Sequence, residues 1–258
     1  MAGAISDGLI VGKLEIAFQN PEKKQDLEPM QISFSECAYS ERQQQLLDEY
    51  ARQQIVVETA ILEPDFLTND YYKLSQLAAL SGMQIFADRF AAWVARTNPY
   101  ERPEDIFVIS IRENADPAGQ QISFEEFIGP GYDLAGDRLT LFTYLPERRI
   151  LMHEVTEGFA KALLDPPHHP QIPIEVELGS PQHADSLNRV LKEILHTYLR
   201  EILLLENLSD TGHLVIYEWS DDWSNYFDSG KEWWGAFFWT VYDTRRQRIT
   251  VIGASATD

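Results

Sequence analysis

The sequence holds 258 residues and is strongly acidic: 41 Asp and Glu against 21 Lys and Arg give a formal net charge of −20. Such a chain is repelled by nucleic-acid phosphates and by anionic membrane surfaces, so we expect no nucleic acid and no membrane as a partner. Hydrophobic residues make up 44% and charged residues 24%, which is ordinary for a globular protein and argues against extensive disorder. An acidic surface suits a basic protein partner, or serves solubility alone.

The cysteine content and the first residues of the chain indicate the cellular compartment. Cys37 is the single cysteine, so no intramolecular disulfide can form, as is usual in a reducing cytosol. Residues 1–7 have neither a basic region nor a long apolar core, and so do not predict a signal peptide. No run approaches the length of about 18 consecutive apolar residues that a membrane span needs. We therefore predict a cytoplasmic protein.

The first part of the chain predicts strands followed by two helices. Apolar residues at 9–18 and 32–34 are typical of strands. Ser40 is a suitable N-cap for the helix that follows. A second helix is predicted over 70–96, because apolar side chains recur there at steps of three and four. Gly82 is expected to break or bend this helix, whose role is to cover a sheet.

The middle of the chain predicts two strands, a long loop and a helix. The apolar run 106–111 has the length of a buried central strand. Residues 112–138 are rich in Gly and Pro, with a short helix expected at 124–128. Long loops are often functional, so this stretch is kept as a site candidate. After a strand at 139–145, a helix is predicted over 146–164.

The end of the chain predicts a long helix and an aromatic hairpin. Ser180 and Pro181 open the clearest amphipathic helix of the sequence. Five of the six tryptophans lie between 219 and 239. The segments 233–242 and 249–252 are rich in aromatic and β-branched residues and are joined by a polar turn. They predict a β-hairpin that anchors the core.

The order of these elements indicates the fold class. Strands and helices are interspersed without strict strand–helix–strand alternation, and several strands are expected to be linked as hairpins. This predicts an α+β fold with a mixed, largely antiparallel sheet covered by helices and a C-terminal aromatic β-hairpin. We expect residues 1–258 to form a single domain, because the part beyond the proline-dense segment 165–173 is too small to be independent. That segment is the alternative position for a domain boundary.

The predicted helix before that segment contains a degenerate metalloprotease motif, His-Glu-Val-Thr-Glu. In the full motif two histidines four residues apart bind zinc, and the glutamate between them acts as the base. Here His153 and Glu157 are the candidate zinc ligands, and Glu154 is the candidate catalytic base. The alternative is an exposed helix face on which Glu157 and Lys161 form an ion pair. No cofactor is predicted outside the zinc hypothesis.

A second group combines carboxylates with tryptophans close to the aromatic hairpin. The residues that we predict to take part in binding are Asp221, Asp222, Trp223, Asp228, Glu232 and Trp233. Tryptophan is enriched at interface hot spots, and carboxylates attract basic side chains. Carboxylate pairs also act in glycoside hydrolysis, and such a surface suits a cation or a sugar. The alternative is an acidic loop at the tip of aromatic strands.

These observations predict a protein that acts by binding another macromolecule, with an inhibitor-like or immunity-like role as the concrete form. The expected partner is a basic protein that meets the carboxylates and exposed tryptophans. A metal-dependent hydrolase that uses His153, Glu154 and Glu157 is the first alternative. A small-ligand or carbohydrate-binding module that uses the tryptophan-rich loop is the second. Both binding hypotheses require the tryptophans to be exposed.

Overall fold

The computed structural model of the chain describes residues 32–97, 107–145, 147, 149–152, 157–167 and 180–255. The strand predicted at 9–18 lies outside these residues, and so do His153 and Glu154 of the predicted metal site. None of the helices within the described ranges combines the length and the hydrophobicity of a membrane span.

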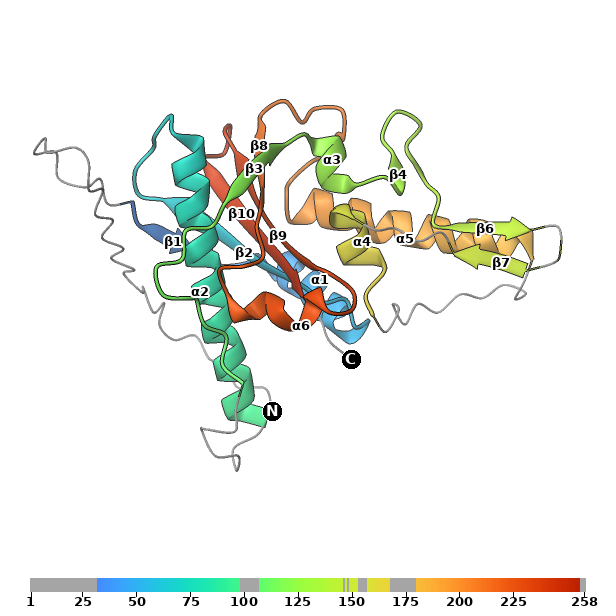
Figure 1. The fold of residues 1–258 in the computed structure, drawn as a ribbon. Helices are drawn as coiled ribbons and strands as arrows, with labels where there is room; N and C mark the ends of the chain where they lie inside the picture. Colours follow the sequence, from blue (N-terminus) through green and yellow to red (C-terminus); the bar gives the residue numbers. More distant parts are fainter. Residues whose placement is uncertain are drawn as a thin grey trace, which may run out of the picture.

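Six strands form one antiparallel sheet at the centre of the molecule (Figure 1). In spatial order they are β1 (Phe34–Glu36), β2 (Val57–Pro64), β10 (Arg248–Ser255), β9 (Ala236–Asp243), β8 (Leu214–Trp219) and β3 (Gly119–Ile122). Two further hairpins pair β4 (Tyr132–Asp133) with β5 (Arg138–Leu139), and β6 (Phe142–Leu145) with β7 (Arg149–Met152). All pairings between the described strands are antiparallel.

The central strands are apolar on both faces because both faces of the sheet are covered. Along β9, Phe237, Trp239 and Val241 pack into one core cluster, whereas Phe238 and Tyr242 pack into the other. Side chains alternate between the two faces of a strand, so burial on both sides produces a continuous apolar run. The aromatic run that predicted the hairpin is therefore a consequence of two-sided burial.

One face of the sheet is covered by α2 (Tyr71–Thr97), which contacts β2, β10 and β9 (Figure 1). The helix continues through Gly82 without a break, so the expected break there is wrong. A β-carbon at position 82 would lie 2.5 Å from Cγ1 of Val251 on β10. Gly82 therefore allows the helix to approach the sheet closely.

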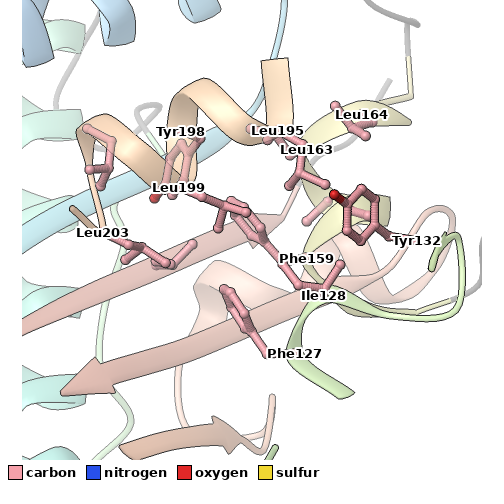
Figure 2. Packing of buried hydrophobic residues seen from close by; sticks show 14 of the residues in the cluster. Phe127, Ile128, Tyr132, Phe159, Leu163, Leu164, Leu195, Tyr198, Leu199 and Leu203 are labelled. Atoms are coloured by element: carbon pink, nitrogen blue, oxygen red, sulfur yellow. The ribbon is translucent and has the colours of Figure 1, made fainter. Parts of the chain in front are cut away.

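The opposite face carries two longer helices, two short helices and a cluster of aromatic rings. These helices are α1 (Glu41–Arg52), α3 (Phe124–Ile128), α4 (Gly158–Leu164) and α5 (Pro181–Glu201). Figure 2 shows Phe127, Phe159 and Tyr198 packed together in this layer. The ring centroids of Phe127 and Phe159 are 5.0 Å apart, and those of Phe159 and Tyr198 are 4.7 Å apart. The central antiparallel sheet, the covering helices and the β9–β10 hairpin confirm the predicted α+β fold.

Two predicted helix starts are confirmed by their caps. The Ser40 hydroxyl accepts a hydrogen bond from the backbone N–H of Gln43, whose side chain accepts one from the backbone N–H of Ser40. This reciprocal pair is a capping box. Ser180 caps α5 by accepting from the backbone N–H of His183 at 3.1 Å. The remaining short helices, between β8 and β9, are η2 (Asn225–Phe227) and α6 (Asp228–Lys231).

The strand predicted at 106–111 is wrong over the residues that the structure describes there. Residues 107–110 join none of the described strands, and Asn225 holds them instead. Its side-chain amide donates to the carbonyl of Val108 at 2.8 Å, and its side-chain oxygen accepts from the backbone N–H of Ser110 at 2.7 Å. The Val108 residue is 56% exposed, so this run is not a buried central strand.

The helix predicted over 146–164 is wrong in its first part. Residues 149–152 form β7, which pairs with β6, and α4 begins only at Gly158. Gly158 has a φ of +85°, and a β-carbon there would lie 2.5 Å from Cα of Gly129. Glycine tolerates this left-handed backbone and this close approach, so the chain can pass close to Gly129 as it enters α4.

Candidate functional site

A cleft opens in the sheet where β8 and β9 separate. Their pairing runs from Leu214 opposite Asp243 to Glu218 opposite Trp239, and ends there. Beyond this point β8 stays paired with β3, while β9 stays paired with β10 as far as Ala236. The cleft between the two diverging strand pairs has a volume of about 470 Å³. Its walls come from β3, β8, the residues after β8 and the start of β9.

One wall carries a tryptophan that its neighbours hold in place. The Trp219 residue is 4% exposed, and its indole Nε1 donates to Oγ1 of Thr240 at 3.0 Å. A β-carbon on Gly119 would lie 2.5 Å from the indole ring, so glycine is needed beneath it. The rings of Tyr72 and Tyr217 also pack against this indole, each with a centroid distance of 5.7 Å. This wall of the cleft is therefore preformed.

The carboxylate of Glu218 lies where the two strands separate. Glu218 is the one exposed residue of β8, and its carboxylate accepts from Nε1 of Trp239 at 3.2 Å. Desolvation raises the pKa of Glu218 against the opposing effect of that hydrogen bond, and the nearby Glu157 and Glu126 raise it further. Among the described side chains, no cation pairs with Glu218. The carboxylate of Glu218 thus lies near those of Glu126 and Glu157, and no cation offsets its charge among the described side chains.

Asp221, one of the predicted binding residues, lines the same cleft. Its Oδ1 atom is 3.1 Å from Nζ of Lys231, and both side chains are partly exposed. Exposed ion pairs of this kind contribute little to stability because water and salt screen them. An incoming cation can therefore compete with Lys231 for Asp221 at a small energetic cost.

The carboxylates of Asp222 and Asp228 are engaged within the chain. Arg112 Nη2 donates to Oδ1 of Asp228 at 2.7 Å, and its Nη1 donates to the backbone carbonyl of Asp222 at 2.8 Å. The Ser220 hydroxyl donates to the Asp222 carboxylate at 2.8 Å and lowers the pKa of that group. Arg112 thus offsets part of the negative charge on which the predicted surface depended.

The two tryptophans of the predicted surface have opposite environments. Trp223 is only 3% exposed and packs against Phe227 and Phe238, so the expectation that it faces a partner is wrong. Trp233 is 74% exposed, and its neighbour Glu232 is also exposed. Both precede β9 in the chain. Trp233 and Glu232 therefore stay available for binding, whereas Trp223 belongs to the core.

The zinc hypothesis required Glu157 to lie within a helix, and it does not. Glu157 is exposed and has an extended backbone immediately before α4, while His153 and Glu154 lie outside the described residues. Within the described ranges, no group of three His, Cys, Asp or Glu side chains is arranged to hold a metal ion. Lys161, expected to pair with Glu157, pairs with Asp165 at 2.6 Å. The hydrolase hypothesis stays an untested prediction.

A group of titratable side chains that the sequence analysis missed lies between α5 and the turn of the β4–β5 hairpin. The Tyr132 hydroxyl donates to the carboxylate of Asp137 and lies 2.6 Å from Nε2 of His196. Lys192 Nζ donates to Oδ2 of Asp137 at 3.0 Å. Asp137 has a φ of 47°, a left-handed conformation that is found mainly in turns.

The protonation states of this group favour a structural role. Burial raises the pKa of Tyr132, which makes its hydroxyl a hydrogen-bond donor rather than a base or nucleophile. Burial lowers the pKa of His196, and the hydrogen bond from Tyr132 lowers the pKa of Asp137. The members therefore satisfy one another at neutral pH. We interpret the group as the attachment of the β4–β5 turn to α5.

Most of the residues that line the cleft were not predicted from the sequence as binding residues. Glu218 carried a usable signal, because it is a lone charged residue in an otherwise apolar strand segment, 214–219. Gly119 and Gln120 fall within the loop-like stretch 112–138 that was kept as a site candidate, but nothing in the sequence placed them beside β8, about 100 positions away. Asp221 was found because it belongs to a visible acidic and aromatic cluster.

No protein-family model, no curated protein and no solved structure matches the chain. Its function is therefore argued from the arrangement of its own side chains.

Proposed function

We propose that the chain is a binding protein whose acidic cleft between β8 and β9 receives a basic region of another protein. An inhibitor-like or immunity-like role, in which the acidic face covers a basic functional surface, is the concrete form. The observation that carries the proposal is the Glu218 carboxylate, which lies in a preformed cleft near Glu126 and Glu157 and lacks a counter-cation among the described residues.

Electrostatics supports a cationic partner. Within the part of the chain that the structure describes, Asp221 forms an ion pair with Lys231, whereas no ion pair joins Glu218 to a basic side chain. A site lined by one sign of charge attracts the opposite sign and speeds encounter. The net charge of −20 makes the rest of the surface repel acidic molecules. A basic protein therefore fits this site better than a nucleic acid, whose phosphates would be repelled.

The neighbouring aromatic residues suit a protein surface. Trp219 and Phe237 line the cleft, and the exposed Trp233 precedes β9. Tryptophan contributes strongly at interface centres, and aromatic faces attract the cationic groups of Lys and Arg. A small ligand or carbohydrate is the second candidate, because the volume of the cleft lies within the usual range for such sites.

The proposal is tested by capture of the partner on tagged protein from a lysate of the native cells. The test variant carries Glu218→Gln and Asp221→Asn. Both substitutions keep the side-chain shape, and Gln retains an oxygen that accepts the bond from Trp239. The control variant carries Glu206→Gln and Asp185→Asn at two exposed positions, which changes the net charge by the same amount.

We expect the wild type and the control to capture the same basic protein at low salt and to release it at about 1 M salt, where the Debye length is about 3 Å. The test variant should retain about a tenth of that protein or less, since loss of a charge-assisted contact costs about 1.5–3 kcal/mol. Equal capture by the test and control variants would place the binding surface elsewhere. Capture of an acidic partner, or none at all, would contradict the proposal.

A further inference from the structure

The start of β9 presents an open strand edge to the cleft. Residues 236–238 pair with β10 on one side, but the ladder with β8 on the other side ends at Trp239. In an antiparallel ladder, successive residues direct their N–H and C=O groups to alternate neighbours. At least one of the three residues therefore directs both groups into the cleft. No described residue forms a β ladder with that side of the segment.

The two faces of this edge differ in chemistry. Phe237 and Trp239 lie on one face with their rings stacked at 5.5 Å, and the Glu218 carboxylate accepts from Trp239 on that face. Phe238 and Trp219 lie in the core cluster of the other face. A strand added to β9 would alternate between the two faces. Its residues on the first face would meet a carboxylate, and those on the second would meet aromatic rings.

From this arrangement we infer that the cleft takes an extended basic segment, which adds as a strand to the open edge of β9. The inference rests on the proposed function and specifies its partner. The segment carries Lys or Arg at alternate positions, where they reach Glu218, and β-branched apolar residues between them. Main-chain hydrogen bonds to 236–238 supply affinity, and the alternation supplies specificity. Charge complementarity identifies the occupant, because the cleft holds Glu218 and Asp221.

The end of the ladder also suits a strand. Paired strands lie about 4.8 Å apart, so a segment can be added to β9 only where β9 is no longer paired with β8, which is the case beyond Trp239. Gly119 allows the Trp219 indole to approach β3 closely, and the indole Nε1 donates to Thr240 of β9, so the ring has a fixed position in the wall of the cleft. An unpaired edge of this kind is the usual template for strand addition.

The test uses a fluorescein-labelled peptide, Lys-Val-Lys-Val-Lys-Val, blocked at both ends, with binding followed by fluorescence anisotropy. Two analogues carry N-methyl groups, one on every Lys amide and one on every Val amide. Each analogue keeps all charges and loses the amide donors along one edge of the extended peptide. We expect at least one analogue to bind about tenfold more weakly, since each lost hydrogen bond costs about 1 kcal/mol.

Chain variants and a second readout complete the design. Glu218→Gln should weaken binding of the unmodified peptide about tenfold, whereas Glu206→Gln should leave it unchanged. Amide hydrogen exchange within 236–238 should slow when the unmodified peptide is bound. Equal affinity of all three peptides would show binding by charge alone and overturn the inference.

The two proposals fail in different ways. Absence of peptide binding, with capture of a basic protein still dependent on Glu218 and Asp221, would overturn strand addition and leave the proposed function standing. If capture of the basic protein did not depend on Glu218 and Asp221, the proposed function itself would be overturned, regardless of the result of the peptide-binding measurements.

Discussion

At the scale of single residues, the chain buries a carboxyl group beside the last strand. Glu58 of β2 lies opposite Gly253 of β10, and its Oε2 atom is inaccessible and lacks a hydrogen-bond partner among the described atoms. Burial raises the pKa of Glu58 to about 7, against the opposing effects of the Tyr226 hydrogen bond and of Arg89. A β-carbon at Gly253 would lie 3.1 Å from the Tyr226 hydroxyl oxygen, so glycine leaves room for this contact.

The raised pKa predicts a loss of stability with rising pH. The pKa of Glu58 is about 7 in the folded protein, whereas its ordinary value, taken for the unfolded chain, is 4.5. Folding therefore favours the protonated form of Glu58. Its contribution is complete below about pH 4.5 and disappears as the pH rises through 7. Between pH 5 and 8.5, we expect the wild type to lose about 1–3 kcal/mol more of its free energy of unfolding than Glu58→Gln does.

Urea unfolding of both proteins at the two pH values measures this difference. Other titrating groups are common to the two proteins, so the comparison isolates Glu58. Parallel losses of stability in the wild type and the variant would show that Glu58 titrates normally in the folded state.

Local rules predicted some residues well and others poorly. The caps at Ser40 and Ser180 were predictable because a capping hydroxyl bonds to an N–H only a few residues away. The opposite exposures of Trp223 and Trp233 were not, because burial depends on distant segments. Trp223 packs against Phe238 of β9, and the short helices η2 and α6 lie between these two residues in the sequence. Composition alone cannot separate the two residues.

At the scale of elements, the contact between α2 and β10 depends on Gly82. In an exposed helix interior, Gly→Ala is stabilising by about 1 kcal/mol. Here the new methyl group would lie 2.5–2.9 Å from the three side-chain carbons of Val251. We expect Gly82→Ala to lower the free energy of unfolding by about 1–3 kcal/mol, because overpacking forces the helix and strand apart.

A double-mutant cycle with Val251→Ala tests the cause. The smaller side chain makes room for the methyl group, so Gly82→Ala should cost less in that background than in the wild type. Chemical denaturation of the four proteins gives the coupling energy. Additive effects, or stabilisation by Gly82→Ala alone, would show that the helix does not rest on the strand at this point.

Two errors at the element scale have identifiable causes. The helix over 146–164 was predicted from a proline at its start and prolines after its end, but such signals do not determine the conformation between them, and 149–152 form β7. The apolar run at 107–110 had strand composition, but Asn225 supplies the hydrogen bonds that a neighbouring strand would otherwise supply. Hydrophobic pattern identified the long elements 71–97 and 181–201 because it persists there over many turns.

At the scale of the whole molecule, function is proposed to reside in a cleft that the topology creates. The cleft is formed by β3, β8 and β9. About 100 residues separate β3 from β8 in the sequence, so no local sequence pattern predicts the cleft. The acidic and aromatic surface predicted from the sequence includes Asp221, which lines this cleft. The contact between Arg112 and Asp228, and the position of Glu218 without a cation among the described residues, could not be predicted, because both depend on segments that are distant in the sequence.

The central claim is that the partner binds in this cleft, and site-specific photocrosslinking tests it most directly. A photoreactive p-benzoylphenylalanine replaces Gln120, which is exposed and lines the cleft, or Glu206, which is exposed in the segment that precedes β8. On irradiation in native lysate, we expect a crosslinked basic protein from position 120, lost at about 1 M salt, and none from position 206. Crosslinking from position 206 but not from position 120 would contradict the account.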